Sequence, residues 1–172
     1  QGTHPLPSEV NVRATADLIQ LVSGLTDEDV VLGIVSGGGS TLLCQPQNFT
    51  YKEEADLISS LMRGGATIEE MNTIRKHLSL ARGGFLAYYA YPARVITMIF
   101  SDVPGNDIEF ISSGPTVRDR TTIQDAQAVL EKYRAKIGLT FDSKNLIETP
   151  KEEKYFKNIA NIFSSVYKNK KG

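Results

Sequence analysis

The sequence predicts an α/β layer fold, with a mostly parallel sheet and helices on both of its faces. Two apolar runs rich in β-branched residues, at 30–35 and 95–100, have the composition of buried strands. Segments with apolar residues at helical spacing precede, separate and follow these runs. Continuous apolar strands that alternate with amphipathic helices are typical of a parallel sheet covered by helices. Ligands bind such sheets beyond the carboxyl ends of the strands.

Helix-capping residues, together with glycine and proline, indicate where each predicted element begins and ends. Ser8 is a candidate N-cap for a first helix that ends near Gly24, and the strand at 30–35 follows. Thr67 and Glu70 have the spacing of a capping box, in which each side chain satisfies a free backbone N–H group. Three helices are expected in the middle of the chain, over residues 50–62, 67–78 and 86–90.

The second half of the chain holds the other strand and two further predicted helices. The strand at 95–100 ends in Ser101-Asp102 and leads into a loop with Pro, Gly, Asn and Asp. Thr121 or Thr122 is a candidate cap for a helix that ends near Lys136. Helical spacing also predicts a last helix in the tail from 148 to 172, where the apolar residues are Phe156, Ile159, Ile162, Phe163 and Val166.

Composition excludes several classes of protein. The 172 residues fit one domain or part of a larger one. A formal net charge of −1 argues against a general nucleic-acid or membrane-surface binder. No apolar run approaches the roughly 18 residues that span a bilayer. The single cysteine, Cys44, allows no internal disulfide and is typical of a cytoplasmic protein. The chain starts at Gln1 without Met, so we expect a piece of a longer protein.

The turn after the first strand is the leading candidate binding element. It reads Ser36-Gly37-Gly38-Gly39-Ser40. Glycines at a strand end tolerate positive φ and let backbone N–H groups approach a ligand. Such a turn before a helix binds anions, typically phosphate or carboxylate, although a plain tight turn explains the same residues. If the two strands are parallel, this turn and Ser101-Asp102 lie at the same edge of the sheet.

Four motifs occur in order along the chain, after an opening GTHPLP at 2–7. They are SGGGS at 36–40, GATIEEMNTIRKHLS at 65–79, SDV at 101–103 and SGPT at 113–116. In these motifs the chain resembles the glycerate 2-kinases whose C-terminal domain is named for the MOFRL signature. The resemblance covers roughly residues 1–150. Members of this family have often been labelled hydroxypyruvate reductases.

The resemblance implies a two-domain enzyme with a Rossmann-like large domain, a smaller MOFRL domain and an active site in the cleft between them. The implied reaction is ATP-dependent phosphorylation of D-glycerate to 2-phosphoglycerate, with Mg²⁺ accompanying the nucleotide. Residues 1–172 then form a partial N-terminal Rossmann-like domain. An upstream strand and helix with an active-site lysine, and the MOFRL domain, would lie outside it. Such a piece is expected to be inactive alone.

Within this resemblance, anion binding falls on the glycine turn and on one helix. Phosphoryl transfer needs positioning and charge neutralisation more than covalent participation by the protein. Ser36 and the run Gly37–Ser40 would bind either a phosphate or the glycerate carboxylate. Arg75 suits a bidentate contact with a carboxylate, and Lys76 suits catalytic neutralisation of phosphate charge. Adjacent helical residues point about 100° apart, so only one of the two is expected to face the site. Asn72 lies one turn earlier, either on the same face or as a surface polar residue.

Asp102 is the leading candidate carboxylate. It stands at the end of a strand, where an acid can hold Mg²⁺, accept the proton of the substrate hydroxyl or simply cap the following loop. Asp107 is the second candidate metal ligand. Gly105-Asn106 stands where the family usually has Gly-Asp, and an amide is a poor base and a poor Mg²⁺ ligand. Arg82 stands where many relatives carry lysine, which keeps the charge but changes the donor geometry.

The remaining candidates have equally good structural explanations. Gly114 and Thr116 would contact the substrate, or they form a rigid turn around Pro115. His4 and His77 are too far apart for a local metal motif, so no structural zinc is expected.

Two other function classes stay open. One is an NAD(P)H-dependent hydroxypyruvate reductase, although the glycine turn lacks G-x-G-x-x-G spacing. The other is a non-catalytic binding or scaffold domain. The expected partners are glycerate and a nucleotide, without nucleic acid or membrane. The sequence fixes neither the acceptor hydroxy acid nor the oligomeric state.

Overall fold

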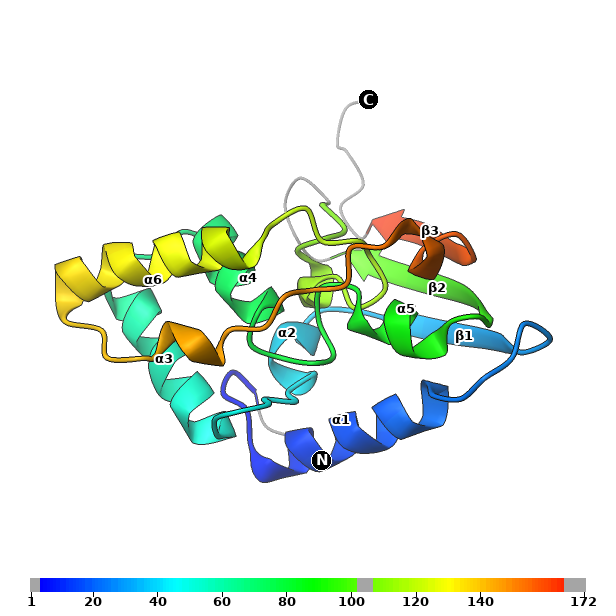
Figure 1. Cartoon of the computed structure of the whole chain (residues 1–172), viewed down its shortest axis with the longest axis horizontal. Coiled ribbons are helices and arrows are strands. Elements are labelled where there is room, and N and C mark those ends of the chain that lie inside the picture. The colour runs from blue at the N-terminus through cyan, green and yellow to red at the C-terminus, as the bar shows by residue number, and fades with distance from the viewer. Residues whose placement is uncertain (1–3, 102–106, 166–172) are drawn as a thin grey trace.

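The computed structural model describes residues 4–101 and 107–165 (Figure 1). The helices are α1 (Glu9–Val22), α2 (Gly39–Leu42), α3 (Tyr51–Arg63), α4 (Ile68–Lys76), α5 (Phe85–Ala90) and α6 (Ile123–Ile137). The strands are β1 (Val30–Val35), β2 (Arg94–Ser101) and β3 (Ile159–Ser165). Three 3₁₀ segments complete the description, η1 (Ile111–Ser113), η2 (Ser143–Asn145) and η3 (Glu153–Tyr155).

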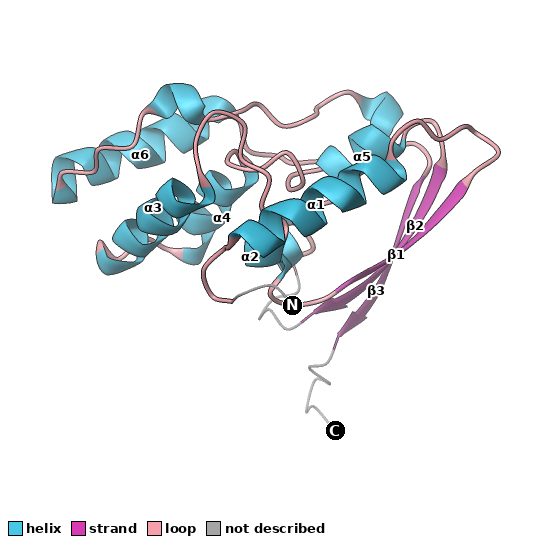
Figure 2. Ribbon diagram, turned by 90° about the horizontal axis from the view of Figure 1, so that it is seen from below, coloured by secondary structure: helices cyan, strands magenta, loops and turns pink. Residues whose placement is uncertain are grey.

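The sheet is parallel, in the order β1-β2-β3. Its register pairs Val35 with Ile99, so the carboxyl ends of β1 and β2 meet at one edge, as the sequence predicts. The α/β fold is therefore confirmed. The described helices lie on one side of the sheet (Figure 2), so the expected helices on both faces are found on one face only in this part of the chain. On the other face, Leu32 and Ile34 of β1 are 65% and 70% exposed.

The helix predicted for the tail is wrong between residues 159 and 165, which form β3. The spacing of Ile159, Ile162 and Phe163 fits a helix, but these residues also have high β propensity. Pairing along β2 from Val95 to Ser101 satisfies their backbone groups and overrides the helical pattern. Only the 3₁₀ turn η3 is helical in the described part of this tail.

Three helices begin with capping boxes. In each, a threonine accepts from the backbone N–H group of the acidic residue three positions later, and that acid accepts from the threonine N–H group. The pairs are Thr50 with Glu53, Thr67 with Glu70 and Thr122 with Asp125. Ser8 precedes α1 but makes no side-chain cap hydrogen bond. Helix α4 ends at Lys76, two residues before its predicted end.

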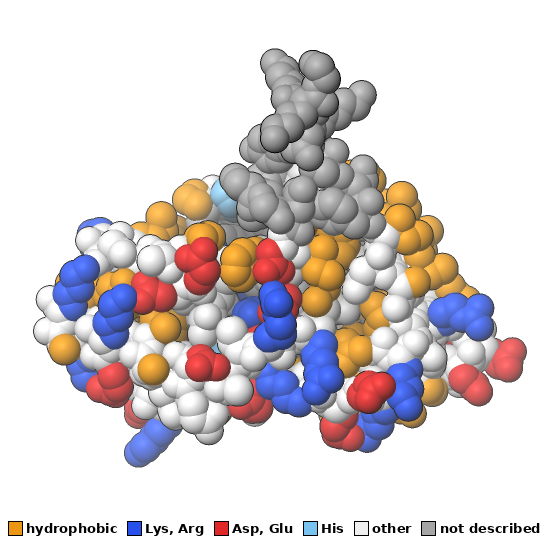
Figure 3. Space-filling view, turned by 90° about the horizontal axis from the view of Figure 1, so that it is seen from above, with side chains coloured by type: hydrophobic (Ala, Val, Ile, Leu, Met, Phe, Trp, Pro, Cys, Tyr) orange, Lys and Arg blue, Asp and Glu red, His pale blue; other side chains and the backbone are white. Residues whose placement is uncertain are grey.

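Two hydrophobic clusters hold the layers together. The larger lies among α3, α4 and α6, around Leu61, Ile74 and Leu130, which are fully buried. The smaller joins α1 and α5 to the sheet through Val22, Ala90 and Val95. Acidic and basic side chains are interspersed over the face shown in Figure 3. No helix among residues 4–101 and 107–165 is long and apolar enough to cross a membrane.

Candidate anion-binding site

The glycine turn lies at the carboxyl end of β1 and leads into α2. Gly38 has φ 85°, in the left-handed region that favours glycine. Gly39 meets a second constraint, because a Cβ atom there would lie 2.2 Å from the Ser112 hydroxyl oxygen. The turn therefore needs glycine twice, once for its backbone conformation and once for close approach by another turn.

That second turn has a rare backbone conformation. Ser112, Ser113 and Gly114 are consecutive and have φ values of 55°, 57° and 59°. Left-handed φ in non-glycine residues costs on the order of 1 to 2 kcal/mol each, and such strain clusters at functional sites. We call residues 112–114 the serine turn.

Side-chain contacts join the serine turn to the glycine turn and to α4. The Ser112 hydroxyl donates to the Ser36 carbonyl oxygen at 2.6 Å. Ser113 Oγ lies 2.9 Å from Ser40 Oγ and 3.2 Å from Asn72 Oδ1. Segments far apart in the chain are thus held at one place.

These segments line one cavity of about 340 Å³, within the usual size range for small-molecule sites. Its glycine and polar lining residues are His4, Gly37, Gly38, Ser40, Thr41, Asn72, Arg75 and Ser112. We call this cavity the anion pocket. Of the predicted site residues, the structure therefore brings together Gly37, Gly38, Ser40, Asn72 and Arg75. Ser36 and Gly39 line a second cavity instead.

Arg75 is the cation of the anion pocket. No carboxylate of the described residues lies within ion-pair distance of its guanidinium group. Burial, followed by the positive charge of Arg82, lowers the pKa of Arg75, and the charge of Glu54 opposes this shift. A desolvated guanidinium without a carboxylate partner is stabilised by a bound anion, and its fork of donors suits a carboxylate or a phosphate.

Lys76 is the next residue along the chain but does not line the anion pocket. Its Nζ atom lies 3.2 Å from Glu109 Oε2 and 2.5 Å from Asp119 Oδ1, and the side chain is 1% exposed. Burial opposes ionisation of Asp119, but hydrogen bonding and the charge of Lys76 outweigh it and lower the pKa of Asp119. His77 Nε2 lies 3.5 Å from the other oxygen of Asp119. The expectation that only one of the Arg75–Lys76 pair faces the site agrees with this arrangement.

Gly114 and Thr116 have mainly structural contacts. Gly114 accepts a hydrogen bond at its carbonyl oxygen from the Gly84 N–H group, at 2.8 Å. The Thr116 hydroxyl donates to Asn161 Oδ1 at 3.3 Å. Thr116 does not line the anion pocket. It lines a separate, mainly apolar cavity between the sheet and helices α1 and α5.

The candidate metal ligands are placed only in part. Asp102 and the neighbouring Gly105-Asn106 lie outside the described residues. Asp107 Oδ1 accepts from the Glu109 N–H group at 3.0 Å, and Asp107 Oδ2 lies 3.0 Å from the Arg120 guanidinium. Across 4–101 and 107–165, no group of three or more His, Cys, Asp or Glu residues is arranged to hold a metal ion.

Sequence reasoning missed several residues of the site. Ser112 and Ser113 form the strained turn, and His4 and Phe110 line the anion pocket. The SGPT motif pointed to this region but not to a left-handed serine pair, since positive φ in a non-glycine residue has no simple sequence signal. His4 belongs to the opening GTHPLP motif, and this motif was the signal that could have indicated its place in the site.

Comparison with known proteins places the chain in a family. Residues 1–147 match the family model described as "Domain of unknown function (DUF4147)". The chain belongs to the DUF4147 family. A DUF4147 relative from Agrobacterium vitis, named "Putative hydroxypyruvate reductase", is 46% identical over 77% of this chain and 31% of its own length. One from Thermotoga maritima, named "D-glycerate 2-kinase", is 42% identical over 88% of this chain and 36% of its own length.

Solved structures confirm the DUF4147 fold. The crystal structure of a glycerate kinase from Thermotoga maritima superposes with a TM-score of 0.85 at 39% identity. It covers 94% of this chain, and the chain covers 39% of it. A protein of Pyrococcus horikoshii gives a TM-score of 0.84 at 32% identity, over 95% of this chain and 39% of its own. The chain thus spans between about a third and two fifths of the length of these relatives.

Proposed function

We propose that this protein acts in the ATP-dependent phosphorylation of D-glycerate to 2-phosphoglycerate. The observation that carries the proposal is the anion pocket, in which a glycine turn and a strained serine turn meet an arginine that has no carboxylate partner among the described residues. D-glycerate and ATP are both anionic, and both present the oxygen acceptors that such donors bind. The names of the relatives from Thermotoga maritima support the same reaction. The 172 residues would then correspond to part of a Rossmann-like large domain.

We assign roles to the site residues on chemical grounds. Arg75 would bind the planar carboxylate of glycerate with two parallel hydrogen bonds. The backbone N–H groups of Gly37 to Ser40 would hold a phosphate group, for which converging N–H donors are suited. Asn72 would keep the serine turn in place through its contact with Ser113. Lys76 would act indirectly, since its charge is already matched by Glu109 and Asp119.

Asp102 is the proposed proton acceptor for the substrate hydroxyl. It follows directly on β2, which ends at Ser101 beside the glycine-turn edge of the sheet. A carboxylate near that edge would accept the proton as the hydroxyl oxygen attacks phosphorus.

Mg²⁺ would accompany the nucleotide and neutralise charge on its phosphates. Asp107 does not fit a metal ligand as it lies, because one of its oxygens accepts a hydrogen bond and the other pairs with Arg120. A role for Asp107 and Asp102 in holding Mg²⁺ stays a prediction. Small anionic metabolites as partners, and the single reduced cysteine, favour a cytoplasmic location without nucleic-acid or membrane partners.

The test is ³¹P NMR of ATP, Mg²⁺ and D-glycerate with the full product of the gene. A 2-phosphoglycerate signal that disappears when Arg75 is replaced by Gln is the expected result. ATP that stays intact in the presence of D-glycerate would refute the proposal. Oxidation of NADH by hydroxypyruvate, followed by absorbance, would instead favour the reductase alternative.

A further inference from the structure

A fully buried arginine lies directly behind Arg75. Arg82 is 0% exposed, and its Nη1 atom donates to the Arg75 carbonyl oxygen at 3.1 Å. Its Nη2 atom lies 2.7 Å from Glu54 Oε1. Glu54, on α3, is itself 2% exposed. Solvent therefore screens this ion pair very little.

The cluster around this pair carries an excess of positive charge. The Cys44 thiol adjoins this pair, with its sulfur 3.4 Å from Glu54 Oε2. Burial, followed by the charge of Glu54, raises the pKa of Cys44 to about 12, so the thiol is neutral at physiological pH. Arg75 and Arg82 supply two cations, and Glu54 supplies one carboxylate. One positive charge therefore remains, on the side of the cluster that lines the anion pocket.

Arg82 also has unused hydrogen-bonding capacity, because its buried Nε atom has no partner among the described groups. Among the groups that the structure describes, its guanidinium is thus held by one carboxylate and one backbone carbonyl. The Glu54 carboxylate therefore offsets only part of the repulsion between the positive charges of Arg82 and Arg75. A negative charge in the anion pocket would relieve it.

We propose that Glu54 offsets the buried charge of Arg82, so that Arg75 presents a single excess positive charge and the site at Arg75 takes a singly charged carboxylate in preference to a doubly charged oxyanion. This inference rests on the proposed function, because it identifies the group at Arg75 as the carboxylate of D-glycerate. Glu54 and Arg82 do not line the pocket. They are positioning residues, which act on the ligand through Arg75 and through their charge.

A double-mutant cycle that changes the buried charge, which we call the charge cycle, distinguishes an electrostatic role of Glu54 and Arg82 from a purely structural one. The full product of the gene is titrated with D-glycerate and with sulfate, by calorimetry, as the unchanged protein and as Glu54→Gln, Arg82→Gln and the double variant. Glutamine approximates the shape of glutamate, and at position 82 its amide can donate toward the Arg75 carbonyl oxygen. The local excess charge then becomes two, zero and one positive charges in the three variants, respectively.

Glu54→Gln is expected to tighten sulfate binding and to tighten D-glycerate binding by less. Arg82→Gln is expected to weaken the binding of both anions, and the double variant to return toward the unchanged protein. Unit charges roughly 10 Å apart, at an effective dielectric constant of about 20 to 40, give changes of about fourfold to fifteenfold. Arg82→Lys keeps the charge and should bind both anions within about twofold of the unchanged protein.

The single variants each leave a buried charge unpaired, so their unfolding is measured in parallel. The double variant removes both charges and keeps the test decisive if a single variant does not fold. Weaker binding of both anions in every variant, without recovery in the double variant, would overturn the inference. Phosphorylation of D-glycerate by the gene product together with that pattern would leave the proposed function standing. The expected charge cycle without any phosphorylation would overturn the proposed function instead.

Discussion

Arg75 and Lys76 are neighbours in the chain, yet they lie in opposite surroundings. The Lys76 ammonium group is enclosed by Glu109 and Asp119, and its side chain is 1% exposed. The Arg75 guanidinium lines a cavity and has no carboxylate partner among the residues described. The rotation of about 100° between adjacent helical residues is enough to place one cation among carboxylates and the other beside a cavity.

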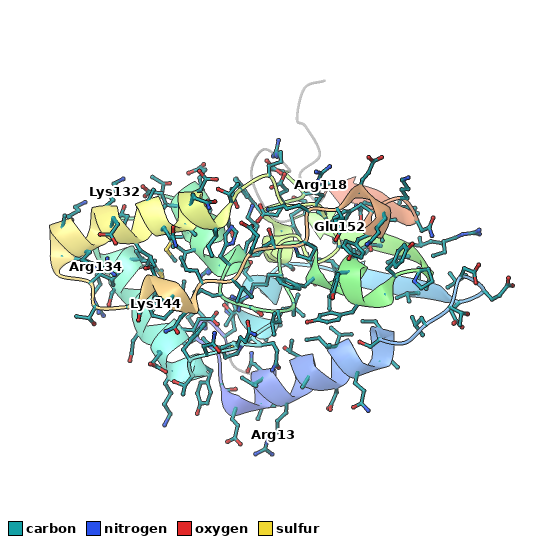
Figure 4. All side chains as sticks on the ribbon, viewed as in Figure 1. Arg13, Arg118, Lys132, Arg134, Lys144 and Glu152 are labelled. Atoms are coloured by element: carbon teal, nitrogen blue, oxygen red, sulfur yellow. The ribbon has the colours of Figure 1, made fainter. Side chains whose placement is uncertain are left out.

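The difference shows that burial alone does not identify a functional cation. What distinguishes the two is whether the protein itself supplies the counter-charge. Exposed cations differ from both: Figure 4 shows Arg13 and Lys132 at the periphery of the molecule, and their side chains are 74% and 56% exposed.

Lys76→Met should have the largest effect on stability. It leaves the carboxylates of Glu109 and Asp119 buried without their cation, which costs about 3 to 5 kcal/mol of unfolding free energy. Urea unfolding measures this cost. Lys132→Met is the matched control, because the Lys132 side chain is 56% exposed and its pair with the half-buried Glu70 should contribute less. Equal stability of Lys76→Met and the control would show that the buried network is not what holds Lys76.

Arg75→Gln should affect binding and leave stability almost unchanged. Loss of a charge-assisted contact with a carboxylate corresponds to about 1.5 to 3 kcal/mol, or a weakening of at least about tenfold. Titration with D-glycerate gives the affinity, and urea unfolding gives the control. A large loss of stability with intact affinity would reverse the roles assigned to Arg75 and Lys76.

Gly39→Ala should disturb the shape of the anion pocket rather than its charge. The new Cβ atom would meet Ser112 Oγ at 2.2 Å and displace the serine turn, at a cost of about 1 to 3 kcal/mol. Adding Ser112→Gly removes the clash and suits the positive φ, so the double variant should recover stability. No recovery in thermal unfolding would mean that the two turns do not meet as described.

The stability contributed by the buried network around Lys76 should depend on pH, whereas the surroundings of Arg75 should add no such dependence. Burial lowers the pKa of His77 below its ordinary 6.5, so the unfolded state takes up a proton first as pH falls. Stability from this group is complete above about pH 6.5 and is lost below it. The lowered pKa of Asp119 adds a second loss, below its ordinary value of 3.8. Unfolding free energy against pH, compared with His77→Gln, should isolate the first loss; identical profiles would contradict it.

Local signals predicted much of the fold. Capping pairs such as Thr67 with Glu70 and the apolar runs at 30–35 and 95–100 act within a few residues, so the sequence was sufficient to find them. The strand at 159–165 was missed because its partner is β2, more than sixty residues earlier. No local pattern reports that pairing.

The candidate site was predictable in its residue types but not in its geometry. The glycine turn follows from chemistry that the sequence displays, and Arg75 was proposed within the family resemblance. The left-handed pair Ser112-Ser113 does not, because tertiary hydrogen bonds to Ser36 and Ser40 hold it in place. The assignment of Lys76 to the buried network likewise needed the positions of Glu109 and Asp119, which lie far along the chain.

The most direct measurement follows the side-chain nitrogen resonances of Arg75 and Lys76 by NMR while D-glycerate is added. The account predicts that the Arg75 guanidinium signal shifts in a saturable way and that the Lys76 ammonium signal stays in place. A saturable shift of Lys76 with an unmoved Arg75 would contradict it.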